Sequence, residues 1–571
     1  MFKPNIQSAL FSFENELSKK HKELLEKSKE KWFYKLIFCN INENIFKPLY
    51  SDNASRPNVP INIMVSALIL KELKGISFDE LMESIIFDLR FKVALGLENI
   101  DELPFARASI FNFQNRIADY EQKTGINLIE TIFDGLTAKQ IKELSLNTNI
   151  QRTDSTLISS NIKRYSRLKL LIEVLIRLER IVSDEDKAMF HNHLQLYIEK
   201  GSEKYFYKLK SKDLPHELQK LANVYHSIYT YISNKEVYKG TKEYVNFERI
   251  YTDHFIVVNQ EISPKPSTEL NSSMLQSPDD AQATYRKKNE KESFGYTINA
   301  TETANPANSL QLIGDIAVNP NNIDDSVILN NQIDKIKDKT HDLNELHTDG
   351  GYGSEENDKK LEQLSITQIT TAVRGRTSEI EKTIEIVDNE QFIYSVSCPC
   401  QNALSTPTKQ RHKTRFDTNI CKTCSLNAKC QIFKDNGRYY FKHEDFLQNI
   451  RNRNILNIPL ERQKIRPNVE ASMKEFKTRT NAGKIKVRGI FKTTLFAFNV
   501  GIAINFGRIF RYLSKLGILP INLTKNIAVC NIFSKLFERI KFNIVNFAIN
   551  RIILNYFLII RFSATSNSGG F

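Results

Sequence analysis

Three acidic residues that are far apart in the sequence are the first candidates for chemistry. Asp154 and Asp349 each end a short run that predicts a β-strand, and Glu470 lies on a predicted helix. Hard divalent cations prefer oxygen ligands, and two such ions about 3.5–4 Å apart activate an attacking oxygen and stabilise the leaving one. We therefore predict that Asp154, Asp349 and Glu470 are catalytic residues that together bind two Mg²⁺ or Mn²⁺ ions.

Basic residues accompany Glu470 along its predicted helix. Lys474 is four positions after Glu470 and Lys477 is about two turns after it, so the three share one helix face. Basic side chains at this place would hold DNA phosphates against the metals, and we predict that Lys474 and Lys477 bind DNA. Plainer alternatives stay open. Asp349-Gly350-Gly351 is also an ordinary loop, and the basic helix is also a solvated charged helix.

Five cysteines lie between positions 398 and 430, in the pattern Cys398-x-Cys400 and Cys421-x2-Cys424-x5-Cys430. Two close pairs of thiols at such spacing are typical of zinc ribbons, in which a tetrahedral Zn²⁺ stabilises a segment with little core of its own. We predict that four of the five cysteines bind a structural Zn²⁺, with His412 as a further candidate ligand. The alternative is a loop of reduced, unligated cysteines.

Length and charge limit the class of protein. The chain has 571 residues, 41% of them hydrophobic and 26% charged, so we expect several soluble domains. Its net charge of +14 favours a polyanionic partner, nucleic acid before an acidic membrane. The start, Met1-Phe2-Lys3-Pro4, has no signal-peptide pattern, so a reducing cytoplasm is expected. Polar residues interrupt the apolar stretch at 542–562, and we predict an amphipathic tail helix and no membrane partner.

The elements around these residues predict a mixed α+β fold. Segments with strand character, several in a row and then alternating with helices, indicate a mixed sheet with helices packed on it. The predicted strands are at 150–156, 283–286, 294–301, 310–318, 345–348 and 366–373. The predicted segments are a helical N-terminal domain at 1–145, the first part of a core sheet at 146–376 with a helical insertion at about 161–261, a Cys-rich insertion at 377–449, C-terminal core helices with Glu470 at 450–517, and a basic tail at 518–571.

The N-terminal helices have two interpretations. Ser77 and Glu80 form a capping-box pattern, and short helices separated by tight turns suit a DNA reader of the helix-turn-helix kind. They suit a helical dimerisation domain equally well. We expect a homodimer or a higher oligomer in a complex with DNA.

Together these motifs are specific enough to indicate a family. The chain resembles the DDE transposases of bacterial insertion sequences, in the group similar to insertion-sequence family eleven-eighty-two. That family has its first Asp before Ser or Thr, as in Thr153-Asp154-Ser155-Thr156, and its second in a segment similar to the one running from Asp349 to Asn357. Its Glu lies in a Tyr-x2-Arg-x3-Glu-x6-Lys signature, which Arg466, Glu470 and Lys477 fit, with Gln463 at the Tyr position.

The resemblance implies a ribonuclease H-like core and magnesium-dependent cleavage of the element's ends. It also implies strand transfer into target DNA by a terminal 3′-hydroxyl, without a covalent enzyme intermediate. Asp154, Asp349 and Glu470 would be the metal ligands, and Arg466 and Lys477 would contact phosphates near the scissile bond.

We therefore expect a transposase that acts on double-stranded DNA, at element ends and at target sites, in the cytoplasm in association with the nucleoid. Two alternatives stay open. One is a nuclease of the same fold that only hydrolyses nucleic acid, and the other is an inactive DNA-binding relic. The presence of all three acids argues against a relic.

Overall fold

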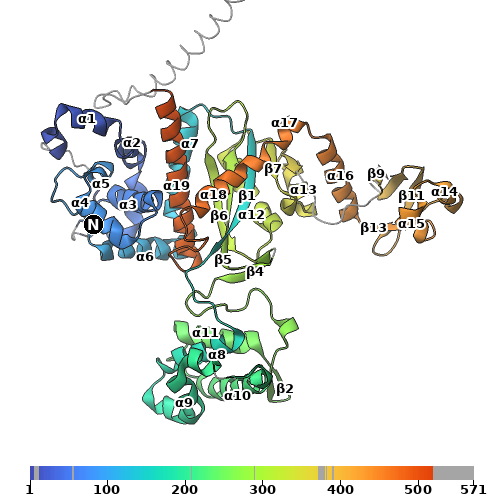
Figure 1. Ribbon diagram of the computed structural model, residues 1–571, viewed down its shortest axis with the longest axis horizontal. Coiled ribbons are helices and arrows are strands. Elements are labelled where there is room, and N and C mark those ends of the chain that lie inside the picture. The colour runs from blue at the N-terminus through green and yellow to red at the C-terminus, as the bar shows by residue number, and fades with distance from the viewer. Residues whose placement is uncertain are drawn as a thin grey trace, which may run out of the picture.

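The computed structural model describes most of the chain (Figure 1). The described residues are 1–5, 12–53, 57–207, 209–288, 290–370, 380, 382–388 and 391–517. The predicted basic tail at 518–571 lies outside them, as do residues 371–373 at the end of the last predicted core strand.

Helices make up the N-terminal region, as predicted. They are α1 Lys19–Glu26, α2 Lys29–Leu36, α3 Ile61–Lys74, α4 Phe78–Phe87, α5 Leu89–Ala94, α6 Arg107–Thr124 and α7 Leu128–Glu143. The apolar helix α3 ends at Gly75, whose φ of +69° is a left-handed conformation that glycine adopts without strain. The predicted capping box then starts α4, since the Ser77 side chain accepts from the Glu80 amide and the Glu80 carboxylate accepts from the Ser77 amide.

A mixed sheet forms the centre of the molecule. Its strands are β1 Ile150–Ser159, β4 Thr284–Lys288, β5 Lys291–Thr303, β6 Ile313–Pro320, β7 Glu345–Thr348 and β8 Thr367–Thr370. The order is β4-β5-β1-β7-β8, and β6 also pairs with β5. The β1–β5 and β5–β6 pairs are antiparallel, whereas β1–β7 and β7–β8 are parallel. Helix α12 (Asp325–Lys339) connects β6 to β7, and α13 (Glu355–Gln363) connects β7 to β8. The predicted mixed α+β class is confirmed.

The helical insertion leaves the sheet after β1 and has a hydrophobic core of its own. Its helices are α8 Arg167–Glu179, α9 Asp184–Tyr207, α10 Leu214–Ile232 and α11 Lys242–His254. The expectation of helix to about residue 261 is wrong, because a hairpin of β2 (Phe255–Val258) and β3 (Glu261–Pro264) begins at Phe255. Asn259 and Gln260 take the positive φ values, +50° and +67°, that a two-residue hairpin turn requires.

The Cys-rich insertion is a small β-sheet with its own core around Tyr394 and Phe441. Its strands are β9 Thr383–Asp388, β10 Ile393–Cys398, β11 Gln401–Pro407, β12 His412–Arg415 and β13 Arg438–Phe441. Two short helices, α14 (Thr418–Thr423) and α15 (Gln431–Lys434), lie between β12 and β13. Figure 1 shows this insertion at one end of the molecule, joined to the core through α16 (His443–Asn457).

The C-terminal helices join the two sides of the molecule. After α17 (Leu460–Gln463) and the short 3-10 turn η8 (Arg466–Asn468), α18 (Val469–Lys477) packs on β1, and α19 (Ile490–Lys515) runs between the N-terminal helices and the sheet (Figure 1). Helix α19 is apolar enough to cross a membrane by length and composition, but 78% of its most apolar window is buried in this protein. It is therefore the central core helix, and one hydrophobic cluster extends through it from α2 and α3 to β6.

Candidate active site

The strand register places the two predicted aspartates side by side. Asp154 lies in the middle of β1, so the prediction that this acid ends its strand is wrong, because pairing with β5 continues β1 to Ser159. Strand β1 runs parallel to β7 with Arg152 opposite His347. Two further steps in this register bring Asp154 opposite Asp349, the first residue after β7. Asp349 turns the chain, because its carboxylate accepts a hydrogen bond of 2.7 Å from the Gly351 amide at the start of the 3-10 turn η6 (Gly350–Tyr352). As predicted, Asp349 directly follows the end of a strand.

Glu470 comes to the same place from α18. The buried face of this helix, which includes Val469 and Phe476, packs in the hydrophobic core, and the side chain of Glu470 stays 64% exposed on the other side. One turn earlier, Arg466 points between the acids. Its guanidinium thus connects α18 to β1 and to the residue that follows β7.

The Arg466 guanidinium contacts all three predicted catalytic acids. Nη2 lies 3.2 Å from Asp154 Oδ2 and 3.8 Å from Asp349 Oδ2, and Nη1 lies 3.1 Å from Glu470 Oε1. The Arg466 side chain is only 16% exposed, and its buried Nε has no hydrogen-bond partner among the described residues. The structure therefore brings the acids together around a cation supplied by the chain. Arg466, predicted to contact phosphates, contacts the three acids in the structure.

The donor set suits divalent metal ions in kind. The three side chains offer only carboxylate oxygens, which Mg²⁺ and Mn²⁺ prefer, and they meet around a single positive charge. Within the described part of the chain, however, no three His, Cys, Asp or Glu side chains already stand in positions that could hold a metal ion. The carboxylate oxygens that a metal would use are in contact with the Arg466 guanidinium instead.

Negative charge is crowded around Asp154, which is 8% exposed. Burial raises the pKa of this carboxyl, and the charges of Asp349 and Asp325 raise it further, against the opposing effects of the Ser155 amide and Arg466. Burial likewise raises the pKa of Asp325, with Asp349 adding to the effect. Two like charges near a buried carboxylate disfavour its ionised form, and a cation bound beside it would relieve this repulsion.

Sequence reasoning missed Asp325, a fourth carboxylate near the site. It is the first residue of α12, and its side chain has a hydrogen bond to Ser155, the neighbour of Asp154. The signal that could have found it is a second acid after Asp324 at the start of the helix that follows β6. That pattern is also an ordinary helix start, which hides its placement.

A buried ion network fixes α18 on β1. Glu302 of β5 is 1% exposed, and its carboxylate binds Arg152 Nε at 2.7 Å, Arg508 Nη1 at 2.7 Å and Ser472 Oγ at 2.7 Å. Burial opposes ionisation of Glu302, but Arg508 and Arg152 outweigh it and hold its pKa below the ordinary value. Since Arg152 is on the strand of Asp154 and Ser472 is on the helix of Glu470, the network sets the distance between those two acids.

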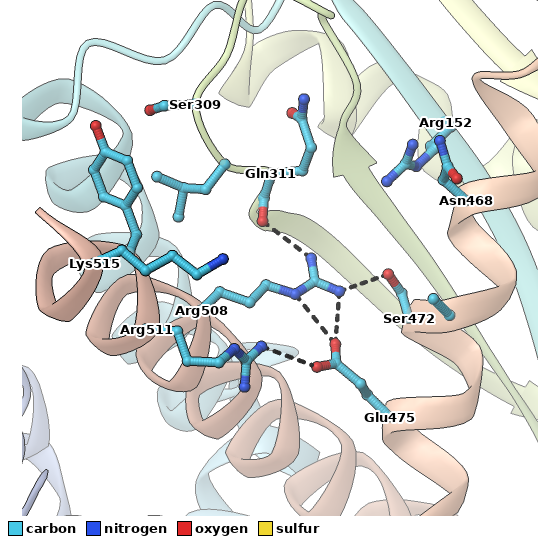
Figure 2. A pocket seen from close by; sticks show the side chains of 12 residues that line it. Arg152, Ser309, Gln311, Asn468, Ser472, Glu475, Arg508, Arg511 and Lys515 are labelled. Atoms are coloured by element: carbon cyan, nitrogen blue, oxygen red, sulfur yellow. Dashed lines mark hydrogen bonds and ion pairs between the residues drawn. The ribbon is translucent and has the colours of Figure 1, made fainter.

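Figure 2 shows a pocket of about 440 Å³ next to α18, which is lined by Arg152, Ser472 and Arg508 of this network. Arg508 reaches from α19 to Ser472 Oγ at 2.6 Å and to Glu475 Oε2 at 2.7 Å, while Arg511 and Lys515 line the same pocket. The pocket lies on the face of α18 that carries Ser472 and Glu475. Its arginines are largely engaged in holding the helix in place.

The remaining predicted DNA-binding residues lie on the solvent side of α18. Lys474 and Lys477 are exposed. Neither forms an ion pair with any other residue that the structure describes. Both charges are therefore free to meet a polyanion beside Glu470.

The five predicted zinc ligands line one small cavity of about 20 Å³ in the Cys-rich insertion. Cys398 ends β10, Cys421 is on α14, and Cys430 precedes α15, so three separate elements supply the thiols. Cys400 Sγ and Cys424 Sγ are 3.1 Å apart. Thiolates are soft donors of the kind that zinc prefers, but among the described residues no three of these thiols stand where they could hold a metal ion.

His412, the further candidate, does not line that cavity. Its ring packs edge-on against Tyr394, with the ring centroids 4.6 Å apart. It also packs against Phe441, with the two rings tilted relative to each other. Half-buried His412 packs against the hydrophobic core of the insertion.

Comparison with known protein families assigns a class to both ends of the molecule. Residues 20–116 match a family described as "Transposase domain (DUF772)", and residues 396–510 match a family described as "Transposase DDE domain". The second match includes the cysteine cluster, Arg466, Glu470 and Lys477, whereas Asp154 and Asp349 lie between the two matches. These domains indicate a DNA transposase of the DDE class. No curated protein and no solved structure matches the chain.

Proposed function

We propose that this protein is a transposase that cleaves the ends of an insertion sequence and joins them to target DNA, with a ribonuclease H-like domain as its catalytic core. The observation that supports this most strongly is the meeting of Asp154, Asp349 and Glu470 around one guanidinium, from three elements that are distant in sequence. The sheet agrees with that core. Strand β5 pairs antiparallel with both β6 and β1, and β7 and β8 continue the sheet beyond β1 in the direction parallel to it.

In this proposal Asp154, Asp349 and Glu470 hold two Mg²⁺ or Mn²⁺ ions. When bound, the ions would activate the attacking oxygen and stabilise the leaving oxygen of the phosphodiester. Asp154 is held by the sheet and by the Ser155 amide, which donates to Oδ1 at 2.8 Å. Glu470 is held by α18, so the protein fixes two sides of the site before DNA arrives.

Lys474 and Lys477 would bind the DNA backbone beside the acids. Both are exposed without ion-pair partners in the described chain, on the helix face that carries Glu470. Arg466 would leave the acids for a DNA phosphate, since its planar guanidinium can bind two phosphate oxygens as well as carboxylates. The charge of +14 agrees with a double-stranded DNA partner.

The Cys-rich insertion would bind one structural Zn²⁺ through four of Cys398, Cys400, Cys421, Cys424 and Cys430. We further propose that the protein works as a homodimer or a higher oligomer on DNA, in the cytoplasm with the nucleoid. The N-terminal helices, which match a transposase domain, are the natural candidate for end recognition or dimerisation.

A strand-transfer assay tests this function. Purified protein is incubated with Mn²⁺, a labelled duplex that carries the terminal sequence flanking the reading frame, and a supercoiled target plasmid. The proposal predicts labelled end joined covalently to the plasmid. Nicks in the end duplex without any joined product would instead identify a nuclease, and end binding without nicks would identify a relic.

A further inference from the structure

Asp325 is a buried acid whose place in the fold needs an explanation. It is the first residue of α12 and is 5% exposed. Capping of the helix is done by its neighbour, because the Asp324 carboxylate accepts a hydrogen bond of 3.1 Å from the Ser326 amide. Asp325 is therefore not required as the cap.

The carboxylate of Asp325 is incompletely satisfied. Its Oδ1 is buried and has no hydrogen-bond partner in the described part of the chain. Nor does the acid form an ion pair with any described residue, whereas other buried acids such as Glu302 and Asp315 do. An unpaired buried carboxylate is costly, so such a group is retained where it meets a ligand.

The start of α12 is tied to the turn that presents Asp349. Asn357 Nδ2 donates to the Ser326 carbonyl at 2.9 Å and to the Tyr352 carbonyl at 2.8 Å. Tyr352, which is fully buried, lies among the acids, since its pKa is raised first by burial and then by Asp325, Asp154 and Asp349. All three aspartates therefore lie near the Tyr352 side chain.

We propose that Asp325 is a fourth carboxylate of the metal site and contributes an oxygen ligand through its unpartnered Oδ1. The inference rests on the proposed metal-dependent function, and it extends the site beyond the three acids of the sequence motif. Arg466 contacts three of these four carboxylates, and the fourth, Asp325, is attracted by Arg286 without forming an ion pair with it among the described residues. Four carboxylates near two guanidinium groups leave an excess of negative charge for divalent cations to neutralise.

The plainer explanation of Asp325 is an acid in the first turn of a helix, stabilised by the helix dipole. The two explanations predict opposite effects of the isosteric change Asp325→Asn on the metal-free protein. Removing a helix-stabilising charge lowers the Tm, whereas removing an unpaired charge that is repelled by Asp154 and Asp349 raises it.

The test compares wild type, Asp325→Asn and the matched control Asp324→Asn, which keeps a good N-cap. The Tm is measured in EDTA, and Mn²⁺ binding is measured by titration calorimetry without DNA. We expect Asp325→Asn to have a higher Tm than wild type in EDTA and to bind Mn²⁺ on the order of tenfold more weakly. Asp324→Asn should match wild type in both measurements.

A second measurement uses wild type alone and does not depend on the folding of a variant. Fe²⁺ bound at the site, with ascorbate and peroxide, should cut the backbone next to residue 325 as well as next to 154 and 349. Absence of the cut at 325, or unchanged Mn²⁺ affinity in Asp325→Asn, overturns the inference and leaves the proposed function intact. Failure of wild type to bind Mn²⁺ at all would overturn both.

Discussion

Arg466 supplies the positive charge around which the acids of the site meet. Its charge offsets part of the repulsion among these carboxylates. A guanidinium is a fixed planar cation that cannot be neutralised at ordinary pH, so it keeps the carboxylates close without a metal. The same contacts make it a competitor of the metal for those oxygens.

Replacement of Arg466 should separate these two effects. We expect Arg466→Gln to lower the Tm in EDTA, because the carboxylates then repel one another, and to tighten Mn²⁺ binding by several-fold. Differential scanning fluorimetry and calorimetry measure the two quantities. Arg462→Gln is the control, since Arg462 pairs with Glu345 outside the site. Weaker Mn²⁺ binding in Arg466→Gln than in wild type would contradict this role.

Lys474 and Lys477 should act on DNA and not on the metals. Changing either to Gln removes one phosphate contact, so we expect weaker binding of end DNA and a salt slope of log Kd reduced by about one for each lysine. Fluorescence anisotropy at several salt concentrations measures this. Lys242→Gln, an exposed lysine on α11, should leave the slope unchanged. Identical slopes for all variants would make the two lysines ordinary surface residues.

Among the elements, α18 depends most on long-range contacts, because it places Glu470 beside strands that are distant in sequence. Glu302 is the centre of the contacts that hold it there. Its pKa is below the ordinary value of 4.5, so the folded state binds fewer protons than the unfolded state near that pH. The stabilisation is therefore present above about pH 4.5 and is lost as the pH falls through the lowered pKa.

We expect Glu302→Gln to destabilise the protein by about 3 kcal/mol at pH 7, since it leaves two arginines short of a buried partner. As the pH falls below about 4.5, the loss of stability should be steeper in wild type than in the variant. Urea unfolding followed by tryptophan fluorescence and circular dichroism measures both. Glu475→Gln, at a more exposed partner of Arg508, should cost less. Equal pH dependence in wild type and Glu302→Gln would show that Glu302 is not ionised as described.

The Cys-rich insertion should depend on zinc for its own folding. Freshly reduced protein is expected to contain about one equivalent of zinc, and Cys421→Ser should reduce this content and accelerate hydrogen exchange in 382–449 without affecting β1 or β7. Cys39→Ser, far from the cluster, is the control. Metal analysis that finds no zinc in reduced wild type would defeat this prediction.

Elements with strong local signals could be predicted from the sequence. β7 with its turn at Asp349, the capping box before α4, and α19 closed by Gly517 all depend on nearby residues. The β2–β3 hairpin was missed because the apolar residues of 255–258 continue the pattern of the helix before them. The small sheet of the Cys-rich insertion was missed because its core, around Tyr394 and Phe441, forms only when distant strands pair.

At the scale of the whole molecule, one hydrophobic core connects the N-terminal helices to the central sheet. Phe33 of α2 packs on Phe506 of α19, with ring centroids 5.3 Å apart, and Phe133 of α7 packs on Phe498 at 5.5 Å. A side chain at Gly501 would collide with Ile316 Cδ1 of β6, so α19 and the sheet are in close contact. Such packing, like the positions of Arg466 and Asp325, depends on long-range contacts that no local pattern encodes.

The central claim is that Asp154, Asp349 and Glu470 form one catalytic site, and cleavage by single variants tests it most directly. Wild type, Asp154→Asn, Asp349→Asn and Glu470→Gln are compared for Mn²⁺-dependent nicking of a supercoiled donor that carries the element's ends, with end-DNA affinity measured in parallel. We predict that each variant loses cleavage while its affinity stays near that of wild type, because phosphate contacts come from basic residues. Any one of the variants cleaving at the wild-type rate would remove that acid from the site and contradict the account.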